Sequence, residues 1–81
     1  MKKFEAHILV VDDDDGIRNL VKRYLSENNF LVTTSESAED AEEKISYIKF
    51  DLIVLDIMMP GKSGLEFTLA NKNKINTPIL L

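Results

Sequence analysis

The chain has 81 residues, which is enough for one small domain with a limited core. It is 44% apolar and 30% charged, an ordinary globular composition, and its net charge of −4 argues against direct binding to nucleic acid. It has no cysteine, one histidine and no apolar run of membrane-spanning length. Disulfides, thiolate metal sites, histidine clusters and a transmembrane segment are therefore excluded, and the cytoplasm is the expected location.

The first half of the chain predicts strands that alternate with helices. Residues 6–11 form an apolar run rich in branched side chains, which is typical of a short buried strand. A one-faced helix follows, because apolar side chains recur at the helical spacing at Ile17, Leu20, Val21, Tyr24 and Leu25. It should end near residues 27–29, where asparagines favour a turn. A second strand is expected over residues 30–34, and Ser37 with Asp40 three residues later predicts the start of a second helix.

The second half continues the alternation. The apolar stripe of the second helix consists of Ala38, Ala41, Ile45 and Ile48, and its charged face, which includes Lys44, should meet water. Residues 51–55 predict a third strand that is apolar at successive positions, as in a parallel sheet covered on both faces. Ser63 and Glu66 have the spacing of a capping box for a third helix over residues 64–72, and residues 77–81 predict a fourth strand.

This order, βαβαβαβ, implies right-handed crossovers and a doubly wound parallel α/β sheet. The sequence stops at Leu81 within an apolar run. We therefore expect an incomplete sheet that belongs to a fragment or to a shortened version of a longer protein.

Three carboxylates follow two of the predicted strands. Asp12 and Asp13 come directly after the first strand, and Asp56 closes the third. The carboxyl ends of parallel strands share one edge, so these side chains converge if the first and third strands are neighbours. Ionised carboxylates so close together need a raised pKa or a bound cation, and Mg²⁺ prefers such oxygen ligands. Beside Mg²⁺, Asp56 could attack a phosphoryl group and form an acyl phosphate.

A less specific explanation also exists for each of these acids. The acidic run over residues 12–15 could be a solvated turn in which Asp14 or Asp15 caps the first helix. Asp56 alone could be a polar strand terminus. The combination of the acid pair, Asp56 and the Met-Pro-Gly turn that follows favours the metal site over these explanations.

The stretches VVDD (residues 10–13), DLIVLD (51–56) and MMPGKSG (58–64) resemble the receiver domain of bacterial two-component response regulators, and look most like OmpR-type transcription factors. The resemblance covers all 81 residues and implies a flavodoxin-like receiver fold. It implies that Asp56 is the phosphoacceptor and that Asp13, with Asp12 beside it, binds Mg²⁺. The backbone carbonyl of Met58 would complete the metal site. It also implies that a sensor histidine kinase donates the phosphoryl group, and that the receiver later hydrolyses its own acyl phosphate.

The sequence departs from the family pattern in its fourth strand, where it stops. Receivers have five strands and five helices, and this chain ends before the hydroxyl residue and the strand-five lysine that sense the phosphoryl group. We expect no output domain within these residues either. We therefore expect residues 1–81 to form the N-terminal part of a receiver. It should have low stability or associate with itself through apolar surface on the side of the first helix.

Two functions remain open at this point. The chain either accepts a phosphoryl group on Asp56, or it is a non-catalytic remnant that acts only by docking to other proteins, if it acts at all. A classical enzyme with a small-molecule substrate is poorly supported. The sequence offers no catalytic base, no glycine-rich phosphate loop and no second domain.

Overall fold

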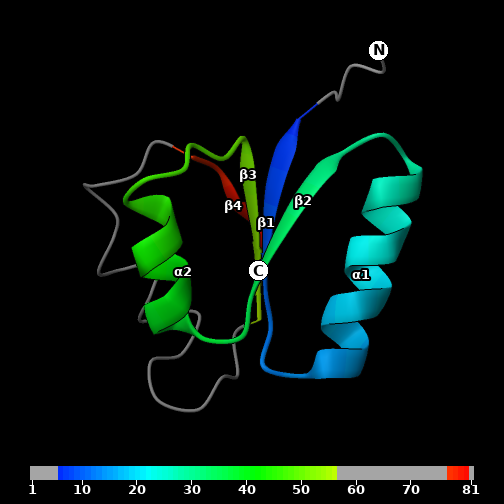
Figure 1. Cartoon of the computed structure of the whole chain (residues 1–81), viewed down its shortest axis with the longest axis horizontal. Coiled ribbons are helices and arrows are strands. Elements are labelled where there is room, and N and C mark those ends of the chain that lie inside the picture. The colour runs from blue at the N-terminus through cyan, green and yellow to red at the C-terminus, as the bar shows by residue number, and fades with distance from the viewer. Residues whose placement is uncertain (1–5, 57–76, 81) are drawn as a thin grey trace.

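The computed structural model describes residues 6–56 and 77–80. Their elements are β1 (His7–Val11), α1 (Asp15–Glu27), β2 (Leu31–Ser35), α2 (Ala38–Ile45), β3 (Leu52–Leu55) and β4 (Ile79–Leu80). The strands form a parallel sheet in the order β2-β1-β3-β4, with α1 and α2 on opposite sides of it (Figure 1). The predicted doubly wound α/β arrangement is confirmed. The predicted helix over 64–72 and its capping pair, Ser63 and Glu66, lie outside the described residues.

The first strand lies at the centre of the sheet and pairs with two neighbours. Val11, its last residue, is in register with Ser35 of β2 and with Leu55 of β3. The predicted convergence of the acids required the first and third strands to be neighbours. The structure shows that β1 and β3 are paired. The residues that follow β1 and β3 therefore emerge side by side at the carboxyl edge of the sheet.

The main core lies between the sheet and α2. Ala38 and Ala41 are fully buried, and their small side chains let the helix approach the sheet closely. They pack in one cluster with alternate strand residues and with Phe50, and Ile45, Ile48 and Ile79 pack against its edge. The members of the cluster are Leu9, Val11, Ala38, Ala41, Phe50, Ile53 and Leu55. The predicted stripe of the second helix is thus confirmed as core, although Ile48 lies beyond the helix end.

The opposite side of the sheet is less completely covered. Ile8 and Val10 are buried there under α1, whereas Leu52 and Val54 of β3 are only half-buried. The prediction that the third strand is covered on both faces therefore holds fully only for the side that faces α2. No residue of α1 is buried, and its stripe includes the exposed side chains of Ile17, Leu20 and Tyr24.

Helix ends follow the local signals. Asp14 caps α1 by accepting a hydrogen bond from the N–H of Ile17 at 2.9 Å, as predicted for this run of acids. The helix ends at Glu27, and Asn29 adopts a positive φ of 70°, a conformation that asparagine tolerates. Ser37 caps α2 by accepting from the N–H of Asp40 at 3.1 Å. Both caps place a helix start at the carboxyl edge of the sheet.

Candidate metal centre

Asp56 is placed by the hydrogen bonding of the sheet. It directly follows β3, and its backbone N–H donates to the carbonyl of Val11 at 3.0 Å. This bond continues the pairing of β3 with β1 by one residue. The side chain of Asp56 is half-buried and stands at the carboxyl edge, where the chain leaves the sheet.

Asp12 and Asp13 reach the same edge from the central strand. The N–H of Asp12 donates to the carbonyl of Ser35 at 3.1 Å, so β2 holds the start of this turn. One carboxylate oxygen of Asp12 then accepts from the N–H of Asp14 at 2.9 Å, which closes a tight local turn. Asp12 is half-buried and Asp13 is exposed, so the pair combines one fixed acid with one that is open to solvent.

The three acids meet in space. Asp12, Asp13 and Asp56 each offer a carboxylate oxygen, and these oxygens lie within 4.8 Å of one another. Opposite ligands of an octahedral Mg²⁺ lie about 4.2 Å apart, since each metal–oxygen distance is 2.0–2.1 Å. A small rotation of one side chain, or one bridging water, would therefore let all three acids serve a single ion. The hard oxygen donors and their net negative charge also suit Mg²⁺.

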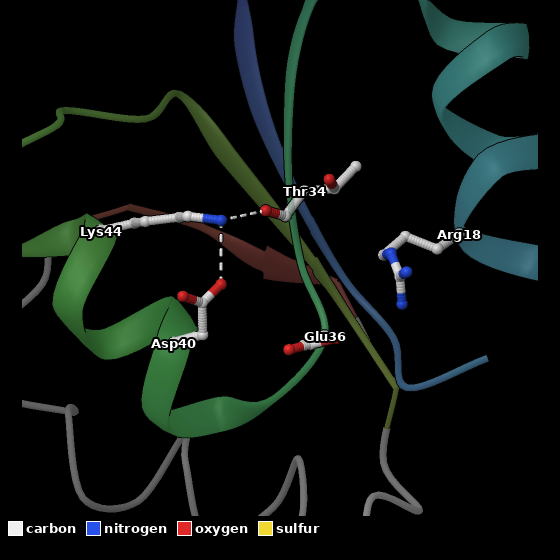
Figure 2. A pocket seen from close by; sticks show the side chains of 5 residues that line it. All are labelled: Arg18, Thr34, Glu36, Asp40 and Lys44. Carbon is white, nitrogen blue, oxygen red and sulfur yellow. Dashed lines mark hydrogen bonds and ion pairs between the residues drawn. The ribbon is translucent and has the colours of Figure 1, made fainter. Parts of the chain in front are cut away.

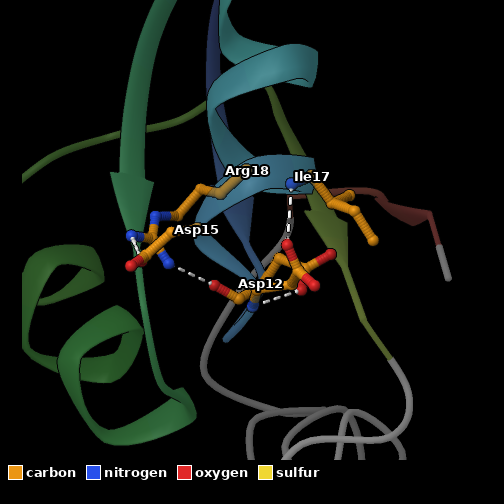
Figure 3. Close-up of polar contacts among 5 residues, drawn as sticks. Asp12, Asp15, Ile17 and Arg18 are labelled. Carbon is orange, nitrogen blue, oxygen red and sulfur yellow. Dashed lines mark hydrogen bonds and ion pairs between the residues drawn. The ribbon is translucent and has the colours of Figure 1, made fainter.

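A cation from α1 reaches into the same turn. The side chain of Arg18 is only 14% exposed, and its Nη1 donates to the carbonyl of Asp12 at 2.8 Å. Its other terminal nitrogen pairs with the carboxylate of Asp15 (Figure 3). The acidic turn is thus held by its own capping bonds and by an arginine from the first turn of the helix.

A polar hollow of about 300 Å³ lies beside this turn, lined by Arg18, Thr34, Glu36, Asp40 and Lys44 (Figure 2). Lys44 crosses it, donates to the carbonyl of Thr34 and pairs with Asp40 at 2.9 Å. The hydrogen bond from Lys44 lowers the pKa of the Asp40 carboxyl below its ordinary value. Lys44 was predicted to face water, and that prediction is wrong because the side chain reaches back to the strand. The charges of Lys44 and Asp40 pair within the hollow, so it is a weaker ligand site than the acid cluster.

The structure brings together three of the four predicted metal-site residues. Met58, whose backbone carbonyl was the fourth, lies outside the described residues. Sequence reasoning missed Arg18. Its spacing of three residues from Asp15 could have suggested an ion pair on the helix, but nothing local to the sequence indicates the bond to Asp12.

The sequence model of the response regulator receiver domain matches residues 8–81, which is nearly the whole chain. The chain belongs to this family. Over its full length it is 49% identical to the protein PetR of Rhodobacter capsulatus, and over 95% of its length it is 40% identical to the transcriptional regulatory protein ResD of Bacillus subtilis. The predicted receiver family is confirmed, whereas the narrower likeness to OmpR-type regulators stays a prediction.

Solved receiver structures show the same fold. The response regulator TrrA of Thermotoga maritima, solved in complex with Mg²⁺ and BeF, superposes with a TM-score of 0.86 at 43% identity and covers 93% of this chain and 66% of its own. A Francisella response regulator receiver domain superposes with a TM-score of 0.85 at 33% identity, and the match covers 93% of this chain and 63% of that domain's chain. The flavodoxin-like receiver fold is therefore confirmed.

This receiver chain spans only part of its relatives. It covers 34% of the length of PetR and 32% of the length of ResD. Among the helices that the structure describes, none is long and apolar enough to cross a membrane.

Proposed function

We propose that this receiver accepts a phosphoryl group on Asp56, with Mg²⁺ held by Asp12, Asp13 and Asp56. The observation that carries the proposal is the convergence of these three carboxylates within 4.8 Å at the carboxyl edge of a parallel sheet. Membership in the receiver family supports the same assignment. By its position in the family pattern, the backbone carbonyl of Met58 is the fourth protein ligand.

The chemistry assigned to Asp56 is nucleophilic attack on phosphorus. One carboxylate oxygen forms a bond to the phosphorus atom, and the bond between phosphorus and the donor's leaving atom breaks, with its electron pair staying on the leaving atom. Bound Mg²⁺ would supply positive charge to the phosphoryl oxygens. The main-chain bond to Val11 holds Asp56 at the rim, while the exposed Asp13 leaves the cluster open to solvent. Hydrolysis of the acyl phosphate by water would restore the free carboxylate.

The proposed donor is a phosphohistidine on a sensor histidine kinase, since the family pattern implies a phosphorelay. In that transfer the leaving atom is an imidazole nitrogen. Receivers of this family act in two-component signalling, and curated relatives such as ResD are transcriptional regulators.

The exposed apolar side chains of α1 also support the expectation of self-association, which sedimentation of the purified chain at several concentrations would test.

The test is the mass of the intact chain after incubation with acetyl phosphate and Mg²⁺. We expect a gain of one phosphoryl group that is absent when a chelator replaces Mg²⁺ during the incubation, and absent in Asp56→Asn. The matched control is Glu39→Gln, which removes the same charge from the exposed start of α2 and should leave the gain intact. No gain in protein that circular dichroism shows to be folded would favour the alternative function, docking without phosphotransfer.

A further inference from the structure

We propose that Arg18 is a positioning residue for the acid cluster: its guanidinium holds the carbonyl of Asp12 and so fixes the direction in which Asp12 and Asp13 present their carboxylates. This inference rests on the proposed Mg²⁺ site. Arg18 is not itself a ligand, because a guanidinium has no free lone pair to offer a cation. Its effect must therefore pass through the turn that it binds.

The contacts of Arg18 are those of a fixed side chain. Nη1 donates to the carbonyl of Asp12 at 2.8 Å, and the other terminal nitrogen pairs with Asp15. The Arg18 side chain is 14% exposed, whereas that of Asp15 is 80% exposed. An exposed ion pair contributes little by itself. The half-buried bond to the carbonyl is the stronger constraint, since it involves a charged donor shielded from water.

The bond to Arg18 completes the constraint on Asp12. The N–H of Asp12 is held by the carbonyl of Ser35, and its carboxylate accepts from the N–H of Asp14. The carbonyl of Asp12 belongs to the same planar peptide group as the N–H of Asp13. When Arg18 holds that carbonyl, the whole peptide plane is held, and with it the backbone position from which the side chain of Asp13 starts. The exposed Asp13 thus has a fixed backbone position beside Asp56, which its own side-chain packing does not supply.

Charge alone would act in the opposite direction. A guanidinium beside the cluster repels a divalent cation, so removing its charge should strengthen Mg²⁺ binding if electrostatics were its main effect. Loss of positioning should instead weaken binding, since partners that orient metal ligands typically account for 10- to 100-fold in affinity. The two explanations therefore predict opposite signs for the same substitution.

The deciding experiment is calorimetric titration of the whole chain with Mg²⁺. We expect Arg18→Met to weaken binding by about 10-fold. Arg18→Lys keeps the charge but loses the planar fork that reaches both partners, and it should also bind more weakly than wild type. The matched control is Arg23→Met, which removes a positive charge from the same helix at an exposed pair with Glu27 and should leave the dissociation constant within about twofold.

Unchanged or tighter binding in Arg18→Met overturns the proposal. If that variant does not fold, Arg18→Lys carries the test, and binding equal to wild type then overturns it. A second readout needs no metal: the amide of Asp14, which bonds to the Asp12 carboxylate, should exchange its hydrogen faster in the Arg18 variants than in Arg23→Met. Unchanged exchange in folded Arg18 variants would also contradict the proposal.

Failure of the proposed phosphotransfer would look different. If wild type binds Mg²⁺ and Arg18→Met binds it more weakly, Arg18 positions the metal site even when no phosphoryl group is transferred. If wild type is phosphorylated while Arg18→Met keeps full affinity, the phosphoacceptor assignment stands and the role of Arg18 fails. A wild-type chain that binds no Mg²⁺ overturns both.

Discussion

The backbone N–H of Asp56 donates to the carbonyl of Val11 at 3.0 Å, and this bond carries the pairing of β3 with β1 one residue past the strand end. Val11 is also in register with Leu55, so the residues after the two strands must leave the sheet together. The result is that Asp12 and Asp56, far apart in the sequence, become neighbours at the rim. Main-chain bonding thus places the acids before any cation is bound.

The first prediction concerns the electrostatic cost of that arrangement. Asp13→Asn should stabilise the metal-free chain, because it removes one of three converging negative charges. It should also remove most of the stabilisation that Mg²⁺ gives to wild type, which reaches about 2.7 kcal/mol at 100 times the dissociation constant. Thermal unfolding with Mg²⁺ and with a chelator measures both effects.

A matched variant separates this effect from a general change in charge. Glu39→Gln loses the same charge from an exposed position on α2, so its response to Mg²⁺ should equal that of wild type. An equal rise in unfolding temperature in Asp13→Asn and Glu39→Gln would show that the ion acts elsewhere on the chain.

The second prediction concerns the cap of α1. Asp14 accepts from the N–H of Ile17 at 2.9 Å, and Asp14→Ala should lower the free energy of unfolding by about 1 kcal/mol because that donor loses its partner. Asp14→Ser retains a capping oxygen and should recover most of the loss. Urea unfolding followed by circular dichroism gives both values. Equal losses in the two variants would mean that charge, and not capping, is what Asp14 contributes.

The capping acid could be predicted from sequence because its signal is local. Capping and helical spacing involve residues within one or two turns, and here Asp14 and Ser37 both occupy the predicted cap positions. The convergence of Asp13 with Asp56 depended on strand order, which no local pattern determines, and so it could be stated only as a condition. The bond from Arg18 to Asp12 was missed for the same reason. It exists only once the turn after β1 has folded against α1.

The difference in burial between the two sides of the sheet also could not be predicted from local sequence patterns. The apolar stripes of the first and second helices look equivalent in sequence, yet Ala41 is fully buried whereas Leu20 is 68% exposed. Periodicity predicts which face of a helix is apolar, but it does not show how much of that face other elements cover. Lys44 illustrates the converse, since a residue on a charged face can still turn back toward the sheet.

The third prediction compares the stability lost when a leucine is shortened on each side of the sheet. Leu9 is fully buried at the centre of the main cluster, so Leu9→Ala should cost about 2–5 kcal/mol and leave much of a small domain unfolded. Leu20→Ala removes the same atoms from an exposed position on α1 and should cost less than about 0.5 kcal/mol. Urea unfolding of the two variants tests this. A comparable loss in Leu20→Ala would show that α1 buries its stripe in solution, as it would in a self-associated chain.

The fourth prediction is a pH dependence at Asp40. Its pKa lies below the ordinary value of 3.8 because Lys44 donates a hydrogen bond to the carboxylate. A carboxyl whose pKa is lower in the folded chain binds fewer protons there than in the unfolded chain. The pair therefore stabilises the fold fully above the unfolded-state pKa of about 3.8, and this contribution is lost as pH falls through the lower folded-state pKa.

Denaturant unfolding of wild type and Asp40→Asn across the acid range tests whether the stability contributed by Asp40 falls with pH. The difference in stability between the two should be largest near neutral pH, at no more than about 1 kcal/mol for a pair this accessible to water, and should shrink as Asp40 becomes protonated. In a Lys44→Met background the substitution at Asp40 should lose most of its pH-dependent effect, because the main donor that lowers the pKa is gone and only the weaker effect of Ser35 is left. A difference that grows toward low pH would mean that protonated Asp40, and not its carboxylate, is the form that the folded chain prefers.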